Sequence, residues 1–160
     1  NWKSQAPSGS SSSSPITFFS GGISSALNIP SGTYYVSPFG ASTTVNTDDR
    51  NKAAIVGKGW VTNFYVTVYE NTTQPVGTNY SIGFNTNTIA GSSPGVEKFH
   101  LNFFGEGINE QCRVMSSGTN SFFWAGGTNT LATVSIINTN GFVLPYSALI
   151  NWSCQLIPVP

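Results

Sequence analysis

The sequence predicts an all-β protein, an antiparallel β-sandwich of jelly-roll type with seven to nine strands. Apolar and polar residues alternate with period two in one segment after another, which is typical of strands with one buried face. Between these segments lie connections rich in Gly, Pro, Ser and Asn, which favour turns. The strands read as half-buried rather than apolar on both faces, which argues against a parallel α/β sheet.

The first 15 residues differ in composition from the remainder. Residues 7–15 are a run of Ser with Pro at both ends, and such a run behaves as a flexible linker. We therefore expect a linker or anchor arm over residues 1–15 and one β-sandwich domain over residues 16–160. The alternative is a loose terminus that packs against the domain.

The first predicted strands are short apolar runs at 16–19 and 33–36, each bounded by turn-forming residues. The next one, 60–69, has two distinct faces, of which the buried one is predicted to hold Trp60, Phe64, Val66 and Val68. Tyr65 and Tyr69 make its other face partly aromatic. Because surplus aromatic residues on an outer face suit a contact between chains, Tyr65 and Tyr69 are the predicted subunit interface.

Four further strands are predicted at 80–84, 98–103, 132–136 and 148–156. Each alternates cleanly, with amides, hydroxyls and few charges on the polar side. The side chains predicted to form the core from these strands are Tyr80, Ile82, Phe84, Phe99, Leu101, Phe103, Ala132, Val134, Ile136, Ala148, Ile150, Trp152, Cys154 and Leu156.

Charge is scarce throughout the chain, and this excludes several functions. Only 8% of residues are charged, where about a quarter is usual, and the formal net charge is zero. The basic residues are scattered, so no patch attracts nucleic acid. No run of 18 apolar residues is present, so we expect no membrane insertion.

The sequence offers little for catalysis or metal binding. His100 is the single histidine, it falls on the polar face of its strand, and no Gly-x-Ser-x-Gly motif accompanies it. The acidic residues suggest no catalytic pair. Residues 46–51 carry several oxygen ligands but lack the Gly and the distal Glu of a calcium loop. We therefore predict a protein that is not an enzyme, with no cofactor and no metal.

Both cysteines are predicted on apolar faces, Cys112 beside Val114 and Cys154 between Trp152 and Leu156. They form either two buried thiols or one disulfide.

An aromatic cluster at Phe122, Phe123 and Trp124 adjoins a Gly-rich loop. Exposed rings of this kind stack on sugars, so these three residues are the candidate ligand-binding site. The alternative is burial in the core or against a neighbouring subunit.

The order of these features resembles the β-sandwich or jelly-roll heads of viral and tailed-phage surface proteins, such as fibre heads and capsid-decorating spikes. The stretches that carry the resemblance are 30–36, 59–66, 78–84, 131–137 and the closing strand 148–158. The resemblance implies a virion-surface or extracellular location, a homotrimer with an N-terminal stalk, and contacts with other virion structural proteins. It implies attachment to a host-surface ligand such as a glycan, or stabilisation of the particle. The alternatives are a shell-forming jelly-roll coat protein and a secreted carbohydrate-binding module.

Overall fold

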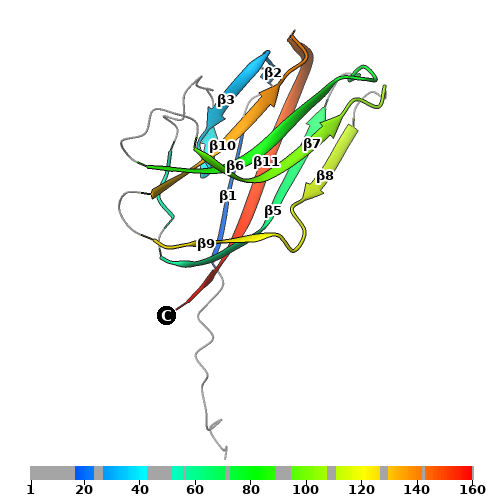
Figure 1. The fold of residues 1–160 in the computed structure, drawn as a ribbon. Coiled ribbons are helices and arrows are strands. Elements are labelled where there is room, and N and C mark those ends of the chain that lie inside the picture. The colour runs from blue at the N-terminus through cyan, green and yellow to red at the C-terminus, as the bar shows by residue number, and fades with distance from the viewer. Residues whose placement is uncertain are drawn as a thin grey trace, which may run out of the picture.

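The chain folds into two stacked β-sheets in a computed structural model (Figure 1). The structure describes residues 17–23, 27–42, 52–55, 57–70, 73–88, 95–107, 111–126, 130–141 and 143–159. These residues form eleven strands and no helix, which confirms the predicted all-β sandwich. The expected linker at 1–15 and the oxygen-rich stretch at 46–51 lie outside the described residues.

Sheet A, the larger sheet, has seven strands, and its main path follows the order β4-β1-β11-β5-β8. Two short strands join it, β2 beside β11 and β9 beside β5. Its pairings are antiparallel except for the parallel pair β1–β4. Its strands span Thr17–Ile23 (β1), Leu27–Ile29 (β2), Gly40–Ser42 (β4), Gly59–Glu70 (β5), Gln111–Ser116 (β8), Ser121–Trp124 (β9) and Leu144–Pro158 (β11).

Sheet B has four strands in the order β3-β10-β6-β7, all antiparallel. They span Gly32–Val36 (β3), Asn79–Thr88 (β6), Val96–Phe104 (β7) and Thr130–Asn138 (β10). The predicted strands correspond to β1, β3, β5, β6, β7, β10 and β11. Strands β2, β4, β8 and β9 add to them. Three of these, β2, β4 and β9, have only three or four residues, which are too few to show an alternating pattern.

The core lies between the sheets, where the inward side chains of β5 and β11 meet those of β6, β7 and β10. Phe64 of β5 stacks on Phe99 of β7, with ring centroids 5.7 Å apart and planes 11° apart, and packs edge-on against Phe84 of β6. Alternation predicted most of this core correctly. Its buried members include Val66, Val68, Tyr80, Ile82, Leu101, Phe103, Ala132, Val134, Ile136, Ile150, Trp152, Cys154 and Leu156.

Trp60 is an exception: the prediction that it lies on the buried face is wrong. Its side chain is 46% exposed, and Val61 is buried in its place. The cause is a β-bulge, because β5 pairs Thr62 with Gln155 and then Tyr65 with Ser153, which leaves two residues of β5 opposite one of β11. The extra residue inverts the alternation, so side chains before the bulge point the opposite way.

Asn63 supplies the backbone conformation that the bulge requires. Among the described residues other than glycine, Asn63 alone has a positive φ, 52°. Asn tolerates this left-handed region better than other residues with a Cβ. Its side-chain amide donates a hydrogen bond to Gln155 Oε1 at 2.7 Å, which ties the bulge to β11.

Replacing Asn63 tests the role of the bulge. We expect Asn63→Val to lower the free energy of unfolding by about 1–3 kcal/mol, because a β-branched residue is strained at this φ. Asn63→Gly relieves strain while losing one hydrogen bond, so it should remain close to wild type. Urea unfolding of both variants measures the difference, and equal stability would contradict the proposed role.

A buried ion pair joins the sheets near the Glu70 end of β5. Glu70 is 1% exposed, and it accepts hydrogen bonds from Arg113 of β8 and, at 2.7 Å, from Tyr80 of β6. The guanidinium of Arg113 also donates to Gln74 Oε1 and to the Phe104 carbonyl. Sheet A contributes the two charges and sheet B the hydroxyl, so this cluster fixes the sheets relative to each other.

Removing one partner should therefore be costly. We expect Glu70→Met to reduce the free energy of unfolding by about 3–5 kcal/mol, because it leaves the largely buried Arg113 guanidinium without a counter-charge. The double variant Glu70→Met with Arg113→Met should recover much of this loss. The control is Glu106→Gln at an exposed carboxylate, which should unfold like wild type. Chemical denaturation measures all four proteins, and a Glu70→Met variant as stable as wild type would refute the ion pair.

Candidate functional site

The outer face of sheet A carries large apolar side chains that face solvent. Seven of them are each between 38% and 57% exposed: Trp60, Tyr65, Tyr69, Val114, Phe123, Leu149 and Ile157. The other residues on this face that pair with them or lie beside them are polar and uncharged, such as Thr67, Ser116, Asn151 and Ser153. None of the described residues that point outward from β5, β8, β9 and β11 is charged.

The strand register gathers the apolar residues into two clusters. In the first, the tyrosine cluster, Tyr69 pairs with both Cys112 and Leu149, while Tyr65 and Val114 lie along the same side. In the second, the tryptophan cluster, Trp60 pairs with Phe123 and with Ile157. The rings of Trp60 and Phe123 meet edge to face, with centroids 5.4 Å apart. The tryptophan cluster depends on the bulge, which turns Trp60 outward on the same face as Tyr65.

A groove of about 500 Å³ borders the tyrosine cluster at Tyr65, on the part of the sheet formed by β4, β1, β11 and β5. Gly22 of β1 lies at its floor, because a Cβ there would collide with the Asn151 side chain and approach the Ile150 carbonyl oxygen to 2.9 Å. Tyr65 and Thr67 of β5 line it on the other side. The groove therefore exists because β1 places small residues, Ser20 and Gly22, beside larger ones on β11 and β5.

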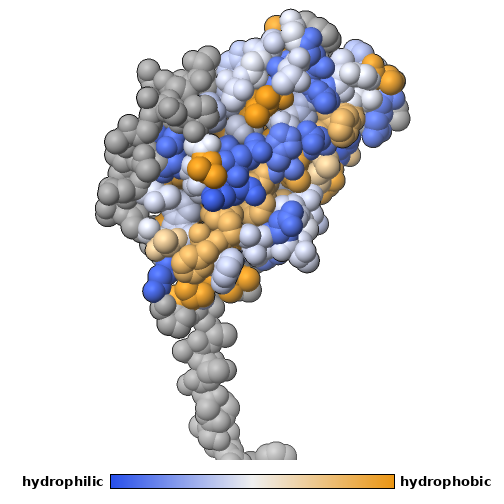
Figure 2. Space-filling view, in the orientation of Figure 1, coloured by the Kyte–Doolittle hydropathy of each residue, from blue (hydrophilic) through white to orange (hydrophobic). Residues whose placement is uncertain are grey.

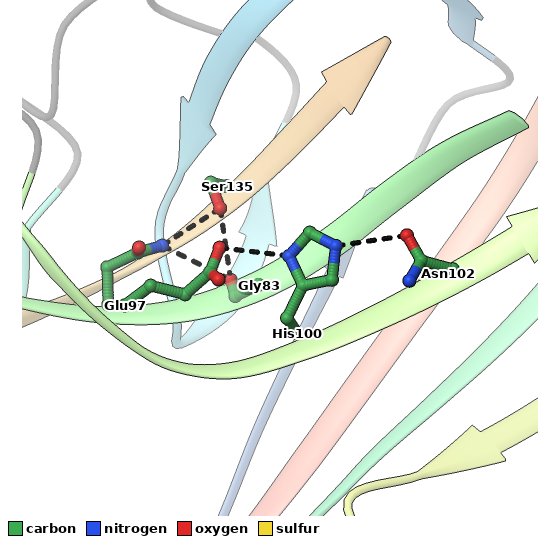
Figure 3. A network of polar contacts seen from close by, with 6 residues as sticks. Gly83, Glu97, His100, Asn102 and Ser135 are labelled. Atoms are coloured by element: carbon green, nitrogen blue, oxygen red, sulfur yellow. Dashed lines mark hydrogen bonds and ion pairs between the residues drawn. The ribbon is translucent and has the colours of Figure 1, made fainter. Parts of the chain in front are cut away.

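The outer face of sheet B has a different chemistry. Glu97 Oε2 lies 3.1 Å from His100 Nδ1, and His100 Nε2 lies 3.0 Å from Asn102 Oδ1 (Figure 3). Asn85 donates to Ser135 Oγ at 2.9 Å in the same region. Figure 2, which views this side, shows hydrophilic residues across β6 and β7. Glu97, His100 and Asn102 thus bind one another, as do Asn85 and Ser135.

His100 occupies the exposed, hydrogen-bonded position that the sequence predicts. A hydrolytic triad needs a nucleophile at the second ring nitrogen, and here that nitrogen contacts the Asn102 amide oxygen. Among the described residues, no three His, Cys, Asp or Glu side chains gather closely enough to hold a metal ion. The described part of the chain also contains no helix that could span a membrane.

The predicted ligand-binding residues do not form one exposed cluster. Trp124 is 2% exposed and belongs to the core, so its prediction as a stacking surface is wrong. Phe122 is half-buried, packs on Phe99, and has the Lys98 ammonium 5.5 Å from its ring centroid. Only Phe123 is well exposed. The four-residue strand β9 alternates across the sheet, so neighbouring rings must point in opposite directions.

Neither alternative for the cysteines, one disulfide or two buried thiols, matches the structure. Cys112 is exposed on the outer face, Cys154 is buried on the inner face, and both thiols are free. Strand β5 lies between β8 and β11, which separates the two strands by roughly 9.5 Å, whereas a disulfide requires Cα atoms within about 7 Å. Cys112 is thus a surface residue of the tyrosine cluster rather than a core thiol.

No protein-family model matches the chain, and no curated protein sequence matches it. Among solved structures it is similar to chains in virus particles. One is from the Gx strain of infectious bursal disease virus, with 11% identity, a TM-score of 0.48, and coverage of 91% of this chain and 33% of that chain. Another is from the Gt strain, with 9% identity, a TM-score of 0.43 and the same coverages. This chain therefore spans about a third of their length, and TM-scores below 0.5 do not establish a family.

The two thiols should differ sharply in reactivity. Burial raises the pKa of the Cys154 thiol, so it holds little thiolate and is inaccessible, whereas Cys112 is open to solvent. In dilute native protein we expect iodoacetamide to add once per chain, and twice in guanidinium without reductant. Intact mass spectrometry counts the adducts, and Cys112→Ser should remove the native one. A denatured chain that takes no adduct before reduction would restore the disulfide.

Proposed function

We propose that this chain is a non-enzymatic structural protein of a virion surface, a fibre head or capsid-attached spike that assembles as a homotrimer. It mediates attachment to the host surface or stabilises the particle. The observation that carries the proposal is the uncharged, partly aromatic outer face of sheet A. Exposed apolar patches of this kind mark contacts with other proteins.

The composition of this face is that of a subunit interface. Interface cores are depleted in charged residues and enriched in Tyr, Trp and Phe, and the tyrosine cluster has both properties. The polar face of sheet B serves as an internal comparison, since Glu97, Lys98 and His100 are exposed there. The difference between the two faces favours contact through sheet A and solvent over sheet B.

The number of copies and the virion setting are supported by the resemblance of the sequence to viral and phage head domains, which are commonly trimers. Tyr65 and Tyr69 are the proposed contact residues, with Leu149 and Val114 beside them. This arrangement also accounts for Cys112, an exposed thiol among apolar neighbours, because assembly covers it.

The oligomeric state tests the proposal. We expect a trimer at micromolar concentration in size-exclusion chromatography with light scattering. Tyr69→Lys should shift it towards monomer, because a buried aromatic anchor contributes about 2 kcal/mol or more, a weakening of roughly 30-fold or greater. The matched control is Val96→Lys, which places the same charge at an exposed valine of β7 and should leave the trimer intact.

Alkylation of Cys112 provides a second readout that does not depend on chromatography. Its rate should fall as wild-type protein is concentrated, and stay constant for Tyr69→Lys. A wild-type chain that remains monomeric at micromolar concentration, with Cys112 equally reactive at all concentrations, would overturn the proposal and favour a secreted module.

A further inference from the structure

The groove on sheet A is lined by polar side chains whose hydrogen-bonding groups are not used within the described part of the chain. Ser20, Thr67, Asn151 and Ser153 all line it, and none of their side chains hydrogen-bonds to any other described residue. On sheet B, by contrast, Asn85, Glu97 and Asn102 are all bound to partners. The groove therefore presents free donors and acceptors, in positions held by strand backbones rather than by loops.

Tyr65 adds an aromatic surface to the same groove. Its side chain is 48% exposed and lines the groove beside Thr67. The ring offers an apolar face with a hydroxyl at its tip, a combination that suits ligands that are apolar on one side and polar at their edges. The volume of about 500 Å³ lies within the range of small-ligand sites, roughly 300–1,000 Å³.

Gly22 puts no side chain on the floor of the groove. The Asn151 side chain lies where a Cβ of Gly22 would stand, so it extends over β1. A ligand can therefore lie flat across β1 and β11. This shape is suited to a ring or a short extended chain more than to a compact ion.

We propose that this groove binds a neutral saccharide. Tyr65 packs against the C–H face of a sugar ring, and the Asn151 amide and the Thr67 hydroxyl bind the ring's hydroxyl groups. The proposal rests on the attachment role proposed above, and it names the class of ligand.

The restriction to neutral sugars follows from the lining. None of the described residues that line the groove is charged, so a carboxylate, sulfate or phosphate would lose water without gaining a counter-charge. Sialylated and sulfated glycans should accordingly bind more weakly than their neutral parents.

Tyr65 borders both the groove and the proposed subunit contact, and the other residues of the two sites differ. The groove extends towards β1 and β4, whereas the tyrosine cluster extends through Tyr69 to Cys112 and Val114 of β8, on the far side of β5. The two proposals can therefore be tested with separate variants.

The experiment uses the full chain, produced in bacteria so that the Asn151-Trp-Ser sequon stays unmodified. A glycan array that pairs each neutral oligosaccharide with its sialylated and sulfated forms identifies the probe, and titration calorimetry with that oligosaccharide follows. Ser20→Trp fills the groove and should weaken binding at least tenfold, and Asn151→Ala should also weaken it. The matched control, Ser121→Trp, places the same side chain on β9 outside the groove and should bind like wild type.

Failure of this proposal is distinguishable from failure of the proposed function. A wild-type trimer that binds no neutral glycan, or prefers the charged forms, overturns the saccharide site and leaves the assembly standing. A wild-type monomer that binds a neutral glycan, and loses it in Ser20→Trp, supports the site and overturns the assembly. Unchanged binding in both Ser20→Trp and Asn151→Ala, with melting curves like wild type, refutes the groove as the site.

Discussion

The stacking of Phe64 on Phe99 joins sheet A to sheet B, and the rest of the arrangement depends on it. Phe64 is fully buried, so the part of β5 that follows it must keep Val66 and Val68 inward as well. Strand β5 nevertheless continues beyond this contact in the other direction, to Gly59. There the bulge reverses its alternation, and Val61 rather than Trp60 enters the core. One residue in a left-handed conformation thus decides that Val61 is buried and that Trp60 is exposed.

Strand β5 ends at the Glu70–Arg113 pair. Burial of apolar rings such as Phe64 is favourable, whereas burial of these charges removes them from water and is unfavourable. Apolar contacts stabilise the sheets wherever they meet, but they do so without fixing one relative position. A buried ion pair contributes little net stability, since removing two charges from water offsets their attraction. Here it accepts a third partner, Tyr80, from the opposite sheet. We interpret the cluster as a device that selects one alignment of the sheets, while the apolar core supplies the burial that stabilises them.

Period-two alternation was sufficient to predict the fold class and most of the core, because each face of a long strand has one environment. Alternation was insufficient wherever a single residue changed which way its neighbours point. The bulge at Asn63 leaves no mark in the hydrophobic pattern, so the orientation of Trp60 could not be derived. The rings of Phe122 to Trp124 are consecutive, and only the pairing of Phe123 with Trp60 shows which of them faces outward. The groove could not be predicted from the sequence for another reason. Ser20, Tyr65 and Asn151 lie far apart in the chain, and only the pairing of β1, β11 and β5 brings them together.

The few charged residues are distributed unevenly over the structure. Glu70 and Arg113 lie inside, Glu97, Lys98 and His100 lie on sheet B, and the described outward residues of sheet A have none. A solvent-exposed face with so few charges is hydrated through hydroxyl and amide groups. Those that line the groove make no side-chain hydrogen bond to other described residues. On sheet B, Glu97, His100 and Asn102 bind one another, whereas the polar side chains of the groove on sheet A remain available. This asymmetry is why we propose both attachment and assembly for sheet A, with Tyr65 bordering both sites.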